Sequence, residues 1–136
     1  PKASDTNEAC RRWLAGLLTQ GVRMVVPEIA DYEVRRELLR ADKQAGLTRL
    51  DVFIDSRGKD YLPITTSVMR DAARLWAEAR KAGKQTASDA ALDGDMILIA
   101  QALSLGLPSG DVIIATKNVS DIARFFPADT WEKITP

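Results

Sequence analysis

Apolar residues recur three and four positions apart along much of the chain, which is the spacing of one helix face. Residues 5–20 show it clearly, because Ala9, Trp13 and Leu17 fall on one side of the predicted helix. The same spacing predicts further helices over residues 27–41, 47–56, 66–83, 90–105 and 118–125. Glycine commonly follows the last residue of a helix, and the predicted stops are Gly21, Gly58, Gly83 and Gly106.

Short apolar runs between these helices predict buried strands. Residues 22–26 form a β-branched run between a glycine and a proline, and residues 111–116 form the clearest buried run in the chain. Residues 61–65 predict a short strand that is an edge strand or a strand end, because Pro63 lacks the backbone N–H that a central strand needs. Residues 130–134 are expected to close the sheet.

Strands that alternate with helices indicate an α/β domain with a largely parallel sheet. Residues 84–89 are polar and predict a loop, and neither an internal repeat nor a low-complexity linker divides the sequence. A chain of 136 residues has the size of one domain, so residues 1–136 are expected to fold as a single unit.

Composition narrows the chemistry that this domain can perform. The chain has no histidine and one cysteine, Cys10, which excludes Ser-His-Asp and Cys-His catalysis, histidine-containing zinc sites and an intrachain disulfide. Basic and acidic residues balance at 19 each, so no overall positive charge indicates a protein that coats DNA. No apolar run reaches the roughly 20 residues of a membrane span and no secretory signal is present, so a cytoplasmic protein without a membrane partner is expected. An enzyme of this composition would use carboxylates, hydroxyls, amines or a hard metal ion.

Polar side chains lie where the predicted topology places a ligand site, beyond the carboxyl ends of parallel strands. Glu33 lies beside the apolar face of the helix after the first predicted strand, and Asp93 and Asp95 begin a later helix. The polar residues after the clearest strand are Thr116, Asn118 and Asp121. Carboxylates that share a cleft repel one another and need a divalent cation, for which Mg²⁺ or Mn²⁺ suits oxygen ligands.

Each candidate also has a structural interpretation. Asp93 and Asp95 would stabilise the positive end of a helix dipole, and Asn118 would cap the short helix that follows it. Glu33 would pair with Arg36 on a solvated helix face. Spacing alone leaves both interpretations open, and the convergence of three separate segments favours a site.

At these residues the chain resembles the PIN-domain nucleases, the family of the VapC-like toxins. Residues 25–33 resemble the family's strand, proline and helix with its glutamate, here Glu33. Residues 95–102 resemble the family's helix in which an aspartate, here Asp95, precedes a run of apolar residues and alanine. Residues 114–121 resemble the family's signature of a threonine, a basic residue and an Asn or Asp. The three motifs occur in the family's order and together span nearly the whole chain from residue 22 onward.

The resemblance implies metal-dependent RNA cleavage on a three-layer α/β fold, with a central, mostly parallel sheet flanked by helices. Glu33 and Asp95 would be the acidic ligands of Mg²⁺ or Mn²⁺, and Thr116 and Asn118 would complete the catalytic site. The accessory acids implied in the same way are Asp93 and Asp121.

The family's domain also begins with a central strand that ends in a metal-binding aspartate. Asp5-Thr6-Asn7 has suitable side chains, but residues 1–4 cannot form a buried strand and the chain from Glu8 onward follows a helical pattern. The strand and its aspartate are therefore expected to lie before Pro1.

Substrate phosphates would need local cations, because the net charge of the chain is zero. The RNA-binding candidates are Arg36, Arg57 and Lys117, within a wider set that adds Arg35, Arg40 and Lys59. The expected partners are an RNA substrate, an antitoxin protein and a second copy of the chain, with Phe125 and Phe126 as a candidate dimer surface. Trp13 and Trp76 lie on apolar helix faces and are expected to pack in the core.

Two other functions stay open from the sequence. A non-catalytic PIN-like module for binding or scaffolding would account for a chain without the first aspartate. A phosphate-handling enzyme such as a phosphatase is less well supported, because the sequence has no Gly-rich phosphate loop and no Asp-x-Asp directly after a strand.

Overall fold

The computed structural model describes residues 3–83 and 89–136, and these divide into two units. One is the 25–106 unit, Val25–Gly106, and the other is the terminal unit, in which Pro1–Met24 joins Leu107–Pro136. Most of the polar loop expected over residues 84–89 lies outside the described residues. In the parts of the chain that are described, no helix has both the length and the apolar character of a bilayer crossing.

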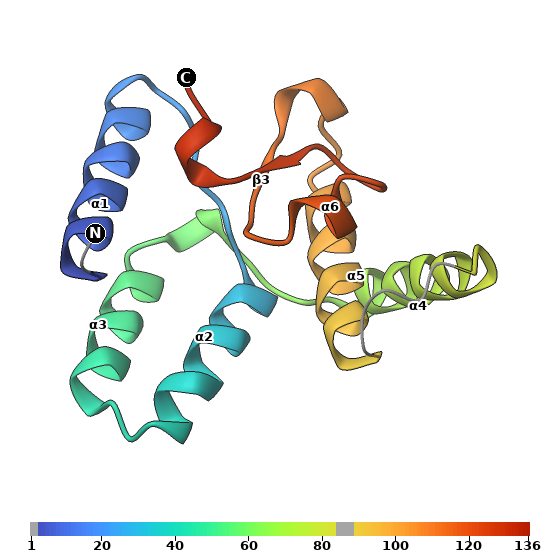
Figure 1. Ribbon diagram of the computed structural model, residues 1–136, viewed down its shortest axis with the longest axis horizontal. Coiled ribbons are helices and arrows are strands. Elements are labelled where there is room, and N and C mark those ends of the chain that lie inside the picture. Colours follow the sequence, from blue (N-terminus) through green and yellow to red (C-terminus); the bar gives the residue numbers. More distant parts are fainter. Residues whose placement is uncertain (1–2, 84–88) are drawn as a thin grey trace. The chain divides into compact units, whose positions relative to one another are not determined.

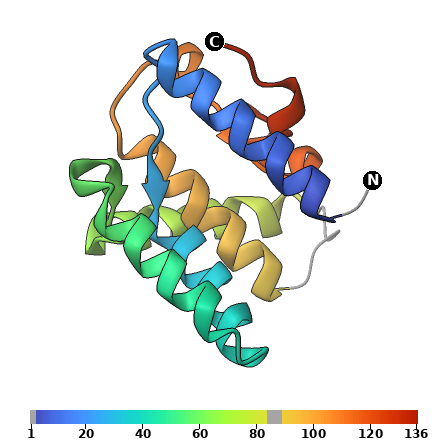
Figure 2. The same cartoon turned by 90° about the vertical axis from the view of Figure 1, so that its left-hand side faces the viewer.

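The 25–106 unit pairs two short parallel strands and surrounds them with helices (Figure 1). Its elements are β1 (Val26–Pro27), α2 (Glu28–Arg40), α3 (Gln44–Asp55), a 3-10 turn (Gly58–Asp60), β2 (Tyr61–Leu62), α4 (Thr66–Lys81) and α5 (Asp89–Leu103). Val26 lies opposite Tyr61 and Pro27 lies opposite Leu62. Helices α2 and α3 run side by side in both views of the chain (Figures 1 and 2).

The core of this unit lies largely between α4 and α5, which pack closely against each other. Helix α4 begins where the Thr65 hydroxyl accepts the N–H of Val68 at 3.1 Å, one residue before the start of the helix predicted over 66–83. The buried positions of α4 recur at helical spacing and are Val68, Ala72, Leu75 and Ala79. They face an apolar stretch of α5 in which Met96 and Ile99 are almost fully buried.

The terminal unit brings the first helix of the chain to its last turn. Its elements are α1 (Ala3–Thr19), a 3-10 turn (Ser109–Asp111), β3 (Ile114–Ala115), α6 (Val119–Ile122), β4 (Ala128–Asp129) and a 3-10 turn (Trp131–Lys133). The Trp13 ring lies 5.6 Å from the Trp131 ring between centroids, and its indole N–H donates to the carbonyl of Ile134 at 2.8 Å. Figure 2 shows the C-terminal turn beside α1. Trp13 is half-buried in this contact and is not one of the buried core residues, so the prediction of core packing is confirmed only in part.

The predicted helices are present, although the one expected over 118–125 covers only Val119–Ile122, and α1 ends as expected at Gly21. This glycine has φ 80°, and the N–H of Val22 reaches back to the carbonyl of Leu17 at 3.0 Å, which closes the last turn of the helix. All four glycines predicted as stops have positive φ, namely Gly21, Gly58, Gly83 and Gly106.

The strands are shorter than predicted, because an apolar run becomes a strand only where another backbone pairs with it. In the run 22–26 only Val26 is in a strand, and in 111–116 only Ile114 and Ala115 are. The strand expected over 130–134 is wrong: β4 lies at Ala128–Asp129, and the chain then turns so that the Trp131 ring packs on Trp13.

The α/β class and the parallel pairing are confirmed. Strands β1 and β2 form one parallel sheet, and β3 and β4 form another. Phe126 is 5% exposed and belongs to the core of its unit, so its assignment to a dimer surface is wrong.

Candidate active site

The glutamate of α2 and the start of α5 come together in the 25–106 unit. Glu33 is half-buried, and its Oε2 lies 3.0 Å from the position that a Cβ on Gly94 would occupy. Its carboxylate therefore rests against the backbone of α5 at a residue with no side chain. Gly94 is flanked in the sequence by Asp93 and Asp95, so the structure places the Glu33 carboxylate against the stretch of α5 that carries these two candidates.

Glu33 also makes the ion pair that its structural interpretation predicts. A guanidinium nitrogen of Arg36 lies 3.9 Å from the same Oε2, and both side chains are about half exposed. A pair this long and this exposed stabilises the fold little, because water screens it. Oε2 thus lies near both the Arg36 guanidinium and the backbone of α5 at Gly94, and the structural and functional interpretations of Glu33 both stay open.

The donor set near Gly94 suits a hard divalent cation. The acidic candidates on these two helices, Glu33, Asp93 and Asp95, would offer carboxylate oxygens. Among residues 3–83 and 89–136, no three Asp, Glu or Cys side chains converge closely enough to form a metal cage. Mg²⁺ is commonly held by one or two carboxylates together with water and substrate phosphates, so a pair such as Glu33 and Asp95 fits it.

The remaining oxygen-bearing candidates lie in the terminal unit, after β3. The hydroxyl of Thr116 accepts the backbone N–H of Asn118 at 3.0 Å, and the N–H of Thr116 donates to the carbonyl of Asp129 at 3.0 Å. Asn118 occupies the N-cap position of α6, but its side chain makes no capping hydrogen bond. Asp121, in α6, pairs with Arg124 at 3.4 Å. The turn that fixes Thr116 and Asn118 therefore depends on Thr116, and the capping role predicted for Asn118 is wrong.

A PIN domain family model matches residues 2–122, which is most of the chain. The chain belongs to the PIN domain family. PIN domains are generally nucleases and typically use divalent metals. Neither a curated protein nor a solved structure matched the chain.

The basic side chains proposed to bind RNA differ in their surroundings in this PIN domain. The guanidinium of Arg36 lies 5.4 Å from the centre of the Tyr32 ring, and that of Arg57 lies 5.0 Å from the centre of the Phe53 ring. Both rings are exposed and lie in the 25–106 unit. Lys117 is exposed in the turn after β3, in the terminal unit.

Arg57 differs from Arg36 in one respect. Its Nε is buried and has no hydrogen-bond partner among the described residues. A buried donor without a partner is unfavourable.

A cavity of about 360 Å³ lies between α4 and α5, with Asp93 in its lining. The other lining residues are apolar or aromatic and include Trp76 and Met96. Because no cation lines it, the cavity offers nothing to a phosphate. Asp93 thus borders apolar side chains on this side.

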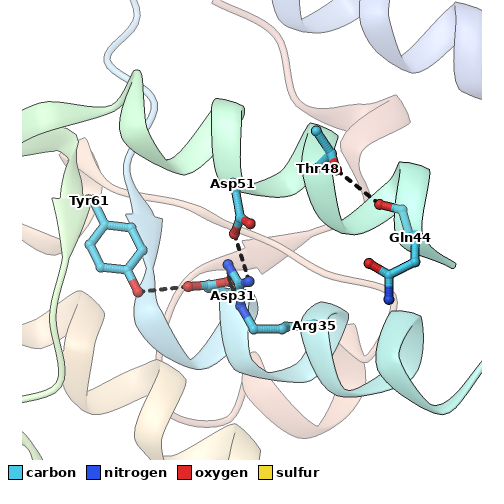
Figure 3. A network of polar contacts seen from close by, with 6 residues as sticks. All are labelled: Asp31, Arg35, Gln44, Thr48, Asp51 and Tyr61. Atoms are coloured by element: carbon cyan, nitrogen blue, oxygen red, sulfur yellow. Dashed lines mark hydrogen bonds and ion pairs between the residues drawn. The ribbon is translucent and has the colours of Figure 1, made fainter. Parts of the chain in front are cut away.

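A polar network that the sequence analysis missed holds α2 in place (Figure 3). Asp31 is 12% exposed; it accepts the hydroxyl of Tyr61 at 2.9 Å and a guanidinium nitrogen of Arg35 at 3.0 Å. Arg35 also bonds Asp51 of α3 at 2.7 Å, and this hydrogen bond raises the pKa of Arg35. The four-residue spacing of Asp31 and Arg35 was a signal in the sequence, whereas Asp51 and Tyr61 come from distant segments.

Proposed function

We propose that this PIN domain is a metal-dependent ribonuclease that hydrolyses RNA phosphodiester bonds with Mg²⁺ or Mn²⁺. The observation that carries the proposal is the contact of the Glu33 carboxylate with Gly94, which brings the acid of α2 to the acidic start of α5. A half-buried carboxylate beside the stretch of α5 that carries Asp93 and Asp95 supports the proposal, because a divalent cation would offset the negative charge there.

In this proposal each candidate residue has a role in metal binding, catalysis or RNA binding. Glu33 and Asp95 bind the metal, Asp93 and Asp121 are accessory acids, and Thr116 and Asn118 orient the reacting groups. Arg36, Arg57 and Lys117 offset the charge of the RNA backbone. A bound Mg²⁺ or Mn²⁺ supplies Lewis-acid chemistry: it polarises the phosphodiester and lowers the pKa of the attacking water.

The finer predictions from the resemblance belong to this proposal. They are one central, mostly parallel sheet between layers of helices, a toxin-like role with an antitoxin partner, a homodimer, and a cytoplasmic location. The balanced charge of the chain supports local recognition of RNA over general coating of nucleic acid.

A non-catalytic PIN-like module is the alternative. One observation favours it: among the described residues, no three acidic side chains form a metal-binding group. The two functions differ in whether the protein binds a divalent cation and whether RNA is cut in its presence.

The deciding experiment uses the full-length protein with RNA, Mn²⁺ or Mg²⁺, and EDTA. We expect cleavage that EDTA abolishes and Mn²⁺ restores. Asp95→Asn should lower kcat by more than about a hundredfold, since changing even the partners of metal ligands costs about 10- to 100-fold. Asp55→Asn, at the exposed end of α3, is the matched control and should cleave as the wild type does.

Calorimetric titration of Mn²⁺ completes the test. Metal binding that Asp95→Asn weakens supports the nuclease. A full-length protein that neither binds Mn²⁺ nor cuts RNA would contradict it and favour the scaffold.

A further inference from the structure

Gln101 is the most deeply buried polar side chain in the described part of the chain. It lies on α5 among apolar neighbours and is 0% exposed. Its Oε1 accepts the backbone N–H of Ile29 at 3.1 Å, and its Nε2 donates to the carbonyl of Leu62 at 2.7 Å. One side chain therefore links α5 to the first turn of α2 and to the end of β2.

These hydrogen bonds satisfy backbone groups that have no partner within their own elements. Ile29 is the second residue of α2, so its N–H has no carbonyl one turn earlier to bond. Pro27 precedes the helix and supplies no side-chain cap. Because Ile29 is 5% exposed, water cannot serve in place of Gln101. Gln101 is in effect the cap of α2, supplied from another helix.

The same side chain joins the two helices that carry the candidate metal ligands. Gln101 follows Asp95 by six residues on α5, which is about 9 Å along a helix, and Ile29 precedes Glu33 by about 6 Å on α2. Helices are stiff over one or two turns. A fixed bond between Gln101 and Ile29 therefore fixes how far Glu33 lies from the start of α5.

Filling the core does not by itself account for glutamine here. Methionine has similar volume and would pack among the same apolar residues without the cost of burying an amide. What glutamine adds is a hydrogen bond at each end of its amide, to two different elements. A Glu28 carboxylate oxygen accepts the N–H of Ile64 at 2.6 Å nearby, so the start of α2 is tied to the β2 region a second time.

We infer that Gln101 is a positioning residue for the metal ligands: its amide sets the separation of Glu33 and Asp95 and so tunes the affinity for the divalent cation. The inference rests on the proposed function, because it gives the two carboxylates their role as ligands. It does not require Gln101 to touch metal or RNA.

The test is Mn²⁺ affinity of the full-length protein, measured by calorimetry without RNA. Gln101→Met keeps the volume and removes both hydrogen bonds, and we expect it to weaken Mn²⁺ binding about 10- to 100-fold, as loss of an orienting partner does. Trp13→Phe is the control, since it removes one indole hydrogen bond, to Ile134, in the terminal unit. Urea unfolding of each variant reports its loss of stability, and Trp13→Phe should bind Mn²⁺ as the wild type does.

Gln101→Glu is a second variant with the shape of the wild type. Burial favours the neutral form of a carboxyl group, and a neutral glutamate can both donate to Leu62 and accept from Ile29. We expect it to recover stability above that of Gln101→Met and to bind Mn²⁺ within about threefold of the wild type, as similar geometry would give.

The outcomes separate this inference from the proposed function. If the wild type binds Mn²⁺ and Gln101→Met binds it equally well, the inference is overturned and the proposed function stands. The same holds if Gln101→Glu regains wild-type stability but binds Mn²⁺ as weakly as Gln101→Met. A wild type that binds no Mn²⁺ overturns both.

Discussion

At the scale of single residues, Gly94 matters because of the side chain that it lacks. In Gly94→Ala, the new Cβ would lie 3.0 Å from Oε2 of Glu33, which is too close for both to keep their places. Glu33 has a flexible side chain, so its carboxylate would shift while α5 stays intact. We expect Mn²⁺ affinity to fall about tenfold, the lower end of what disturbing a ligand's surroundings costs, and thermal stability to stay equal or rise.

Gly16→Ala is the control for that variant. Gly16 lies inside α1, and a Cβ there would meet nothing within 4 Å. Alanine is favoured over glycine within a helix by about 0.5–1 kcal/mol, so both variants gain this contribution. Only Gly94→Ala should lose metal affinity. Equal affinity in the two variants would show that the Glu33 carboxylate does not need its place beside α5.

Tyr61 gives the molecule a pH-dependent stability. Burial, together with its hydrogen bond to Asp31, raises the pKa of Tyr61 above its ordinary value of 10.0. Above pH 10, the unfolded chain therefore loses this proton while the folded chain keeps it. The unfolded state then binds fewer protons, and the free energy of unfolding falls as pH rises.

Tyr61→Phe removes this titration. At neutral pH it should cost about 1 kcal/mol for the lost hydrogen bond, and between pH 10 and 11 its stability should fall less steeply than that of the wild type. Urea unfolding at several pH values measures both effects. Tyr32→Phe, in which the exposed Tyr32 ring loses its hydroxyl, controls for the number of phenols; equal slopes for all three proteins would refute the role of Tyr61.

The sequence could indicate Glu33 and Asp95 but not what positions them. A carboxylate beside an apolar helix face is visible in a linear pattern, and so is an aspartate at a helix start. Gln101 looked like part of an apolar run, because its partners are backbone atoms 72 and 39 residues away. Only the fold brings those atoms to one buried side chain.

At the scale of elements, Arg35 joins α2 to α3. It bonds Asp31 on its own helix and Asp51 on the neighbouring one, and its side chain is 33% exposed. Arg35→Met keeps most of the stem and removes the charge. We expect a loss of about 1 kcal/mol in urea unfolding, the upper part of the range for partly exposed pairs.

Arg40→Met is the matched control for Arg35→Met. Arg40 bonds Glu37 at 2.9 Å, but both residues lie on α2 and both are exposed. Water screens this pair, and it joins no other element, so its loss should leave the unfolding midpoint unchanged. Equal losses in the two variants would mean that the contact between helices contributes nothing beyond local helix charge.

Helices were predictable because their periodicity and their glycine stops are local. At the end of α1, for example, the N–H of Gly21 donates to the carbonyl of Leu18, three residues back, and the N–H of Val22 donates to the carbonyl of Leu17, five residues back. Strands depend on pairing with distant backbone, and the apolar content of residues 130–134 gave no sign that β4 would form two residues earlier. The prediction therefore failed where the deciding contact was nonlocal.

At the scale of the whole molecule, the division into two units was not predictable. The terminal unit joins both ends of the chain, and its hydrogen bond from Trp13 to Ile134 spans 121 residues. No linker composition marks such a division, because the chain passes out of the unit and returns to it. The candidate site residues divide in the same way: Glu33 and Asp95 belong to one unit, and Thr116 and Asn118 belong to the other.

A double-mutant cycle tests whether these two sets act in the same reaction. The proteins are the full-length wild type, Asp95→Asn, Asn118→Ala and the double variant, and the measurement is kcat/KM for RNA cleavage with Mn²⁺. Residues that act as one catalytic unit have strongly non-additive effects. We expect the double variant to be about as slow as Asp95→Asn alone, a coupling of about 1 kcal/mol or more.

The control is a second cycle in which Ser120→Ala is used in place of Asn118→Ala. Ser120 is exposed on α6, two residues away, and the proposal gives it no role. It should leave kcat/KM unchanged alone and in combination with Asp95→Asn. If the fold-losses of kcat/KM in Asn118→Ala and Asp95→Asn instead multiply in the double variant, then Asn118 acts independently of the acidic pair. In that case the motif after β3 serves the fold or the binding of RNA, and not the chemistry at Glu33 and Asp95.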